Sequence, residues 1–139
     1  MTLTRTGVLN ERIVGCLRAL DMEGLAALYR PDALLDVSVP QWRYQLQGAA
    51  AIAEQWREEL APAAGSGWVA SLRETPTADG VAVEVEVHFT LDGEERMWRE
   101  VHLVHTDGEA ITEHVSYCTG IWDAATIARH AVEAPMVRP

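Results

Sequence analysis

The chain has few of the residues on which several large functional classes depend. It contains only two cysteines, Cys16 and Cys118, which are too few for a disulfide framework and lack the spacing of a metal site. The 11 basic residues are outnumbered by 21 acidic ones, which disfavours binding to nucleic acid or to anionic membranes. No apolar run approaches the roughly 18 residues of a membrane span, and no signal pattern opens the chain. We therefore expect a cytoplasmic protein with neutral or weakly charged small molecules as partners.

Cofactor and metal motifs are also missing. The chain has no phosphate loop, no dinucleotide fingerprint and no Ser/His/Asp order. His88 and His114 are expected near glutamates on the outer face of the sheet predicted below, but the strand between them contributes Val101 and Leu103 instead of ligands. We expect neither a cofactor nor a bound metal.

The order of the expected elements predicts one α+β domain over residues 1–139. A chain of this length buries roughly two-thirds of its extended surface, which is enough for a core and a pocket. Helical periodicity, capping residues and period-two alternation predict, in chain order, helices 8–20 and 22–29, strand 33–39, a loop or short strand 41–47, helix 49–60, strand 68–75, three further strands and a last helix from 124 to about 131. Three helices against a curved, mostly antiparallel sheet make a cone, and the mouth of a cone is a natural ligand pocket.

The most informative stretch runs from Val81 to Tyr117 and predicts three antiparallel strands. The first of them alternates, and its buried face consists of Val81, Val83, Val85, Val87 and Phe89. Asp92-Gly93 and Asp107-Gly108 separate the strands. Because Asp-Gly suits a two-residue type I′ turn, both pairs predict tight hairpins and fix the register.

Counting outward from the two turns places ionisable groups in an apolar wall. His102 comes opposite Val83 and Glu113, and Glu100 comes opposite Val85 and Val115. The second and third strands then add these residues to the same face: Trp98, Glu100, His102, Val104, Ile111, Glu113, Val115 and Tyr117. A one-residue slip would turn the middle strand over and present Met97, Arg99, Val101, Leu103 and His105 instead. Turn chemistry and a favourable Glu86–Arg99 pair support the unslipped register.

This polar group predicts the catalytic residues His102, Glu100, Glu113 and Tyr117. A carboxylate beside His102 would set its tautomer and basicity, as a general base or acid requires. Two ionised carboxylates in one pocket would repel each other, so one of them could stay protonated and serve as an acid. The alternative is a buried histidine that one glutamate satisfies, with no reaction attached.

Aromatic and apolar residues predict the substrate-binding wall. These are Trp42, Tyr44, Val85, Phe89, Trp98 and Val115. The hydroxyls of Tyr44 and Tyr117 need partners if they are buried, and could therefore donate to a substrate oxygen. Asp36 alternates with the buried Leu35 and Val37, so we expect it to be solvated or to cap a helix.

Three segments resemble the SnoaL-like group of the nuclear transport factor 2-like superfamily, which includes ketosteroid isomerase, scytalone dehydratase and limonene epoxide hydrolase. They are residues 25–36, Leu-Ala-Ala-Leu-Tyr-Arg-Pro-Asp-Ala-Leu-Leu-Asp; Gly48 with Ile52; and residues 107–114, Asp-Gly-Glu-Ala-Ile-Thr-Glu-His. The resemblance implies the cone fold, catalytic groups that project into it from the middle and neighbouring strands, and a homodimer formed through the outer face of the sheet.

The chain departs from the motifs of these enzymes. His102 falls where ketosteroid isomerases place an acidic oxyanion partner, while Val37 and Ile13 replace their base and helix tyrosine. Glu100-Val101-His102 occupies the place of the Arg-x-Asp pair of limonene epoxide hydrolases. These departures argue against steroid isomerisation and epoxide hydrolysis by those mechanisms.

The sequence thus predicts a cofactor-independent acid–base enzyme of the cyclase, isomerase or dehydratase type. Its substrate would be a small hydrophobic metabolite, such as a polyketide-like or terpenoid intermediate. Because this fold also hosts proteins without activity, the alternative is a non-catalytic module that binds a small ligand or another protein.

Overall fold

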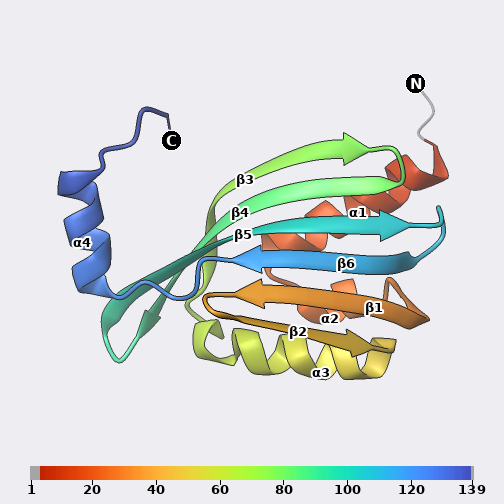
Figure 1. The fold of residues 1–139 in the computed structure, drawn as a ribbon, viewed down its shortest axis with the longest axis horizontal. Coiled ribbons are helices and arrows are strands. Elements are labelled where there is room, and N and C mark those ends of the chain that lie inside the picture. The colour runs from red at the N-terminus through yellow and green to blue at the C-terminus, as the bar shows by residue number, and fades with distance from the viewer. Residues whose placement is uncertain (1–3, 139) are drawn as a thin grey trace.

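The computed structural model describes residues 4–138, and its centre is a curved six-stranded sheet that covers three helices (Figure 1). In chain order the elements are α1 (Arg5–Ala19), α2 (Met22–Ala26), β1 (Tyr29–Val39), β2 (Trp42–Gln47), α3 (Ala49–Leu60), the single 3-10 turn η1 (Ala61–Ala63), β3 (Trp68–Thr77), β4 (Gly80–Leu91), β5 (Glu94–Thr106), β6 (Ile111–Cys118) and α4 (Ala124–Glu133). The predicted α+β cone of a curved sheet around N-terminal helices is confirmed.

The strand order β2-β1-β6-β5-β4-β3 brings the first strand beside the last one. β1 and β6 pair in parallel, and every other neighbouring pair is antiparallel. A parallel pair needs a long crossover, which here consists of β2, α3 and the meander of β3, β4 and β5. Inward-facing side chains of β1, β5 and β6 therefore meet at the centre of the sheet.

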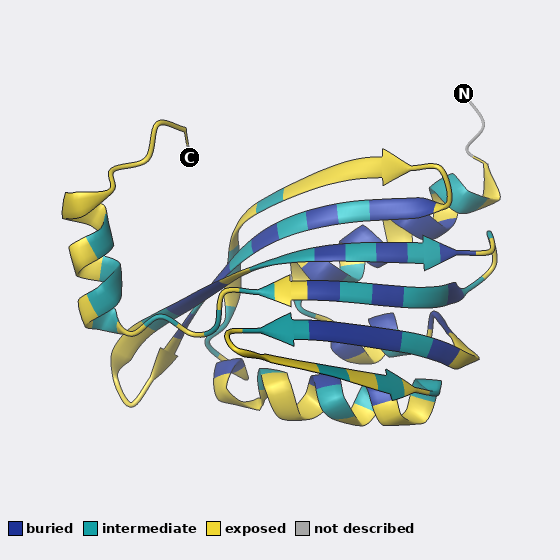
Figure 2. Ribbon diagram, in the orientation of Figure 1, coloured by how far each residue is buried: buried dark blue, intermediate teal, exposed yellow. Residues whose placement is uncertain are grey.

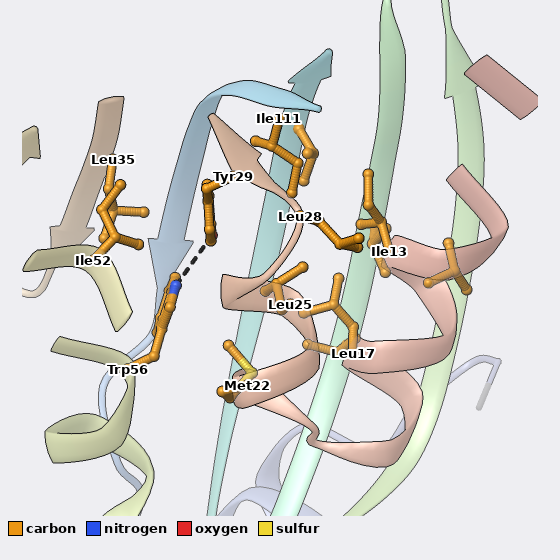
Figure 3. Close-up of a cluster of buried hydrophobic side chains, with 14 of the residues drawn as sticks. Ile13, Leu17, Met22, Leu25, Leu28, Tyr29, Leu35, Ile52, Trp56 and Ile111 are labelled. Carbon is orange, nitrogen blue, oxygen red and sulfur yellow. Dashed lines mark hydrogen bonds between the residues drawn. The ribbon is translucent and has the colours of Figure 1, made fainter. Parts of the chain in front are cut away.

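Local sequence signals explain where the helices begin. Thr4 and Asp21 cap α1 and α2, because their side chains accept hydrogen bonds from the N–H groups of Gly7 and Gly24. α3 follows Gly48, whose φ of 101° is a conformation that glycine adopts without strain. The apolar stripes of the helices then pack with the inner face of the sheet, as the labelled residues in Figure 3 show for Ile13, Leu17 and Ile52.

The first hairpin has the predicted register. Asp92 and Gly93 both have positive φ, at 52° and 77°, as a type I′ turn requires. Val85 pairs with Glu100 and Val83 pairs with His102. The even-numbered residues of β5 consequently face the inside of the cone, and His102 is only 1% exposed.

The predicted register of the second hairpin is wrong. The Asp107 carboxylate accepts hydrogen bonds from the N–H groups of Glu109 and Ala110, so the loop is a wider, Asx-type turn, and a bulge follows between His105 and Thr106. His102 lies opposite Ser116 instead of Glu113, a shift of three residues. Because side chains alternate along a strand, a shift by an odd number of residues turns β6 over. The outward-facing residues and their partners on β5 are Glu113 with His105, Val115 with Leu103, and Tyr117 with Val101.

Two further expectations need correction. Tyr29 was expected in the second helix, but it begins β1 and pairs with Ile111, because this pairing overrides the local helical pattern. Asp36 does face away from Leu35 and Val37, yet it is only 8% exposed instead of solvated. It is covered from β2, where Arg43 Nε donates to its Oδ1 at 2.9 Å.

Helix α4 stands away from the helices at one end of the sheet (Figure 1). It contains no buried residue (Figure 2), and Trp122 joins the segment before it to Met97 of β5. Among residues 4–138, no helix has the length and apolar character that a membrane crossing would need.

Candidate active site

A cavity of about 360 Å³ lies between the inner face of the sheet and helices α1 and α3. This volume is within the range of ligand pockets, about 300–1,000 Å³. Its walls are mostly apolar, with contributions that include Leu17, Val37, Trp56, Val85, Phe89 and Trp98. The polar side chains on the cavity are Glu58, Glu59, Glu100, His102 and Cys118.

The structure brings together only part of the predicted site. Of the ten residues predicted for the site, five line the cavity: Val85, Phe89, Trp98, Glu100 and His102. Glu113, Val115 and Tyr117 lie on the outer face because of the shifted register, and Tyr117 is 55% exposed. Their predicted places beside His102 are therefore wrong.

The two predicted residues of β2 lie outside the cavity lining. Trp42 is 70% exposed near the turn between β1 and β2, where a pocket-lining role has no structural basis. Tyr44 points toward α3, and its hydroxyl is hydrogen-bonded to Glu59 and Gln55. Tyr44 thus holds a carboxylate of the cavity wall instead of facing the cavity itself.

Glu100, on β5, is the carboxylate on the wall of the cavity that the sheet forms. Its Oε1 accepts a hydrogen bond from Trp98 Nε1 at 2.7 Å, and its Oε2 accepts one from Ser116 Oγ at 3.4 Å. Burial raises the pKa of Glu100, but the neighbouring His102 and these hydrogen bonds outweigh burial and place the pKa below its usual value. Glu100 is therefore an ionised carboxylate at neutral pH.

His102 lies beside Glu100 and is held from behind by a second histidine. His102 Nδ1 is 2.8 Å from His114 Nε2, whereas His102 Nε2 lies 3.4 Å from Glu100 Oε1. That Nε2 atom is buried and has no well-aligned hydrogen-bond partner among the described residues. This nitrogen thus lies on the side of Glu100, and the His102 side chain is part of the cavity lining.

The contacts continue behind His114 to two further aromatic residues. Tyr29 Oη is 2.5 Å from His114 Nδ1, and Trp56 Nε1 donates to the same hydroxyl at 3.1 Å, which is the dashed line in Figure 3. Burial, reinforced by the neighbouring His102, keeps the pKa of His114 well below its usual value. Burial raises the pKa of Tyr29, partly offset by the Trp56 hydrogen bond. Both groups are therefore neutral.

Sequence reasoning missed this second layer. His114 was expected on the outer face, yet it is 0% exposed inside the cone, and Ser116 lies opposite His102 where Glu113 was expected. A signal was present, because His114, Ser116 and Cys118 alternate along the last strand. The predicted type I′ turn assigned that face to the outside. Nothing in the sequence placed Tyr29 or Trp56 near a histidine.

The chemistry of the cavity is acidic. Three carboxylates line it, and no arginine does so among the residues the structure describes. Burial, followed by the charge of Glu100, raises the pKa of Cys118 to about 11, so its thiol is not an ionised nucleophile. Within residues 4–138, no group of three or more His, Cys, Asp or Glu side chains is arranged to hold a metal ion.

Comparisons with known proteins agree with this architecture. Residues 10–114 match the family model of the SnoaL-like domain. Similar solved structures include an NTF2-like protein from Anabaena variabilis, at 15% identity over 86% of this chain and 95% of that one, with a TM-score of 0.69. None of the curated protein sequences matches the chain.

Two other similar structures have names that refer to metabolism. A phenazine biosynthesis-related protein from Pseudomonas aeruginosa is 14% identical over 95% of this chain and 91% of that one, with a TM-score of 0.64. An LEH-like epoxide hydrolase from M. tuberculosis is 14% identical over 95% of this chain and 97% of that one, with a TM-score of 0.59. Identities this low support a shared fold and nothing more.

Proposed function

Because the chain belongs to the SnoaL-like domain family, we propose that it is a cofactor-independent enzyme that transfers protons on a small hydrophobic molecule. The family has the NTF2-like fold, whose similar members include a protein named as an epoxide hydrolase. Fold alone does not fix an activity, so the proposal depends on the side chains of the cavity.

One observation carries the proposal: a carboxylate and the imidazole beside it both belong to the lining of one mostly apolar cavity. Glu100 and His102 both line it, 3.4 Å apart, and aromatic side chains surround them. An acid–base catalyst must reach the proton that it moves, and apolar walls strengthen its interaction with a developing charge. A filled core would have no empty volume beside these groups.

The proposed chemistry begins when Glu100 takes a proton from a carbon next to a substrate carbonyl. The electron pair of the broken C–H bond moves to the carbonyl oxygen and forms an enolate. Where a C=C bond is conjugated with the enolate, return of the proton from Glu100 to the far carbon of that bond moves the double bond and completes an isomerisation. Attack of the enolate carbon on a second carbonyl of the same molecule closes a ring, and the alkoxide formed there takes the proton from Glu100. Alternatively, a hydroxyl on the carbon next to the enolate leaves with that proton as water, which completes a dehydration.

The charges of the cavity narrow the substrate class. Glu58, Glu59 and Glu100 would repel an anionic ligand, and no arginine among the described residues lines the cavity to offset them. The aromatic rings of Trp56, Phe89 and Trp98 suit a flat apolar molecule. We expect a neutral or positively charged substrate that carries an acidic C–H bond, and not a carboxylate or a phosphate.

Proton exchange tests this proposal without knowledge of the natural product. The probe is 2-tetralone, a neutral bicyclic ketone, dissolved in deuterium oxide and followed by proton NMR for loss of the signals next to its carbonyl. The protein should accelerate this exchange, and Glu100→Gln should slow it at least about 100-fold, as expected for loss of a general base. The matched control, Glu113→Gln, makes the same chemical change on the outer face and should keep full exchange.

The outcomes separate the two classes of function. Exchange that survives in Glu100→Gln would refute the role of this carboxylate. Binding of 2-tetralone in the cavity without any accelerated exchange would favour the alternative, a non-catalytic ligand-binding module. Tryptophan fluorescence can follow binding, because Trp56 and Trp98 both line the cavity.

A homodimer formed through the outer face of the sheet stays a prediction. That face carries Val101, Leu103 and the exposed Tyr117, which would become buried between two copies. Light scattering of the purified protein distinguishes a dimer from a monomer.

A further inference from the structure

We infer that four buried side chains, of which Trp56 and His102 line the cavity, form a one-way hydrogen-bond relay that holds His102 neutral, with its proton on Nε2. The relay runs from Trp56 through Tyr29 and His114 to His102. On the basis of the proposed function, His102 then donates a hydrogen bond to the substrate oxygen while Glu100 alone takes the proton. His114 and Tyr29 are positioning residues that act through His102.

The indole N–H of Trp56 sets the direction of the hydrogen bonds in the relay, because it can donate a hydrogen bond but cannot accept one. The Tyr29 oxygen must therefore accept from it. Tyr29 then gives its own proton to His114 Nδ1. A neutral imidazole that accepts on one nitrogen carries its proton on the other, so His114 Nε2 donates to His102 Nδ1. The same rule places the proton of His102 on Nε2.

A second proton on His102 would break this order. With both ring nitrogens protonated, Nδ1 would have to donate to His114 Nε2, and His114 would have to turn its own proton toward Tyr29. The Tyr29 oxygen would then face two donors, and its own O–H would be left without an acceptor. A buried donor in that position is unfavourable, because it has lost its hydrogen bonds to water without gaining another partner. The relay therefore disfavours an imidazolium at His102.

The surroundings of the two histidines support a neutral pair. Both rings are almost completely buried, at 1% and 0% exposure. The groups that face His102 are Val83 from β4, Glu100 from its own strand, Ser116 and Cys118 from β6 and Trp56 from α3, with Glu58 and Glu59 across the cavity. Among them only carboxylates would favour a charged ring, and Glu100 also accepts hydrogen bonds from Trp98 and Ser116.

The relay assigns separate tasks to the two cavity groups. His102 Nε2–H is a fixed donor buried beside Glu100 Oε1, with no well-aligned partner among the described residues. A substrate oxygen that enters between these two groups and develops negative charge would accept from it. Neutral imidazole can serve as such a donor in an enzyme. Glu100 is the ionised group within reach of the same substrate. The proton from the substrate carbon therefore goes to Glu100, and the electron pair goes to the oxygen that His102 contacts.

Nitrogen NMR tests the relay directly, without a substrate. In ¹⁵N-labelled protein, long-range correlations distinguish protonated from unprotonated ring nitrogens of each histidine. In both His102 and His114 we expect an unprotonated Nδ1 and a protonated Nε2 at neutral pH. A proton on Nδ1 of His102, or on both of its nitrogens at neutral pH, would overturn the inference.

Two variants complete the test. Tyr29→Phe keeps the ring but removes the proton that His114 Nδ1 accepts, so the His114 and His102 signals should shift toward a mixture of tautomers. Tyr44→Phe removes another hydroxyl of the cone outside the relay and should leave both patterns unchanged. If the relay exists and 2-tetralone is exchanged, Tyr29→Phe should also lower the exchange rate about tenfold. Correct tautomers without any exchange would reject the proposed function and keep the relay, while unchanged tautomers in Tyr29→Phe would reject the relay.

Discussion

Stability measurements on two relay residues give a quantitative prediction. Tyr29→Phe leaves two buried groups without partners, the indole N–H of Trp56 and Nδ1 of His114. His114→Leu also leaves two, the hydroxyl of Tyr29 and Nδ1 of His102. At about 1 kcal/mol for each orphaned group, the lower end of the usual range, each variant should lose about 2 kcal/mol of unfolding free energy through these groups.

The double variant should lose less than the sum of the single variants. With both Tyr29 and His114 replaced, only Trp56 Nε1 and His102 Nδ1 lack a partner, which is two groups instead of four. The double-mutant cycle should therefore give a coupling of about 2 kcal/mol. Changes in side-chain volume occur in both the single and the double variants and largely cancel. A domain with a stability of about 5–15 kcal/mol should keep enough to be measured.

Urea unfolding followed by tryptophan fluorescence measures each corner of the cycle. The matched control combines His114→Leu with Tyr44→Phe, whose hydroxyl is hydrogen-bonded to Glu59 and Gln55 and not to the relay. This pair should be additive within about 0.5 kcal/mol. If Tyr29 and His114 are equally additive, the hydrogen bond between them contributes nothing and the relay is refuted.

Three further predictions concern other parts of the molecule. Hydrogen bonds from Arg43, only partly opposed by burial, lower the pKa of Asp36 to about 2. The contribution of Asp36 to stability is therefore present above its unfolded-state pKa of about 3.9 and is lost as the pH falls toward 2. In Asp36→Asn the loss of unfolding free energy over this interval should be smaller, and an equal dependence of unfolding free energy on pH in both proteins would contradict the ion pair. Tyr117→Phe should keep the exchange rate of 2-tetralone, because Tyr117 lies on the outer face; a loss of more than about threefold, roughly 0.7 kcal/mol, would restore the sequence-based assignment. Among probes of one shape, 2-naphthamide and 2-naphthylmethylamine should quench tryptophan fluorescence and 2-naphthoate should not, since three carboxylates line the cavity; tighter binding of the anion would contradict the expected substrate class.

The sequence predicts the first hairpin but not the second, for a physical reason. At Asp92-Gly93 both residues adopt positive φ, so counting from the turn gives the correct partners for Glu100 and His102. At Asp107-Gly108 the same dipeptide forms a wider loop, because the Asp107 side chain binds backbone N–H groups further along the chain. Two identical dipeptides thus differ through side-chain hydrogen bonds that no periodicity records.

The site residues were predicted correctly on the first hairpin and wrongly on the second. Glu100 and His102 depend on one register and were predicted on the cavity face, whereas Glu113 and Tyr117 depended on the second register and lie outside. The relay could not be predicted from the sequence, because it joins residues that are far apart in the chain. Tyr29 reaches His114 only through the parallel pairing of β1 and β6.

The pH dependence of deuterium loss from α-deuterated 2-tetralone in water tests the central assignment most directly. Burial raises the pKa of Glu100, and the hydrogen bonds from Trp98 and Ser116 oppose this effect. A carboxylate ordinarily titrates at about 4.3, well below a histidine. With circular dichroism as the check that the protein stays folded, the account predicts a rate that is constant from neutral pH to about pH 5 and falls only below about pH 4.3. A rate that falls between about pH 7 and about pH 6, where histidines ordinarily titrate, would identify a histidine as the base and contradict it.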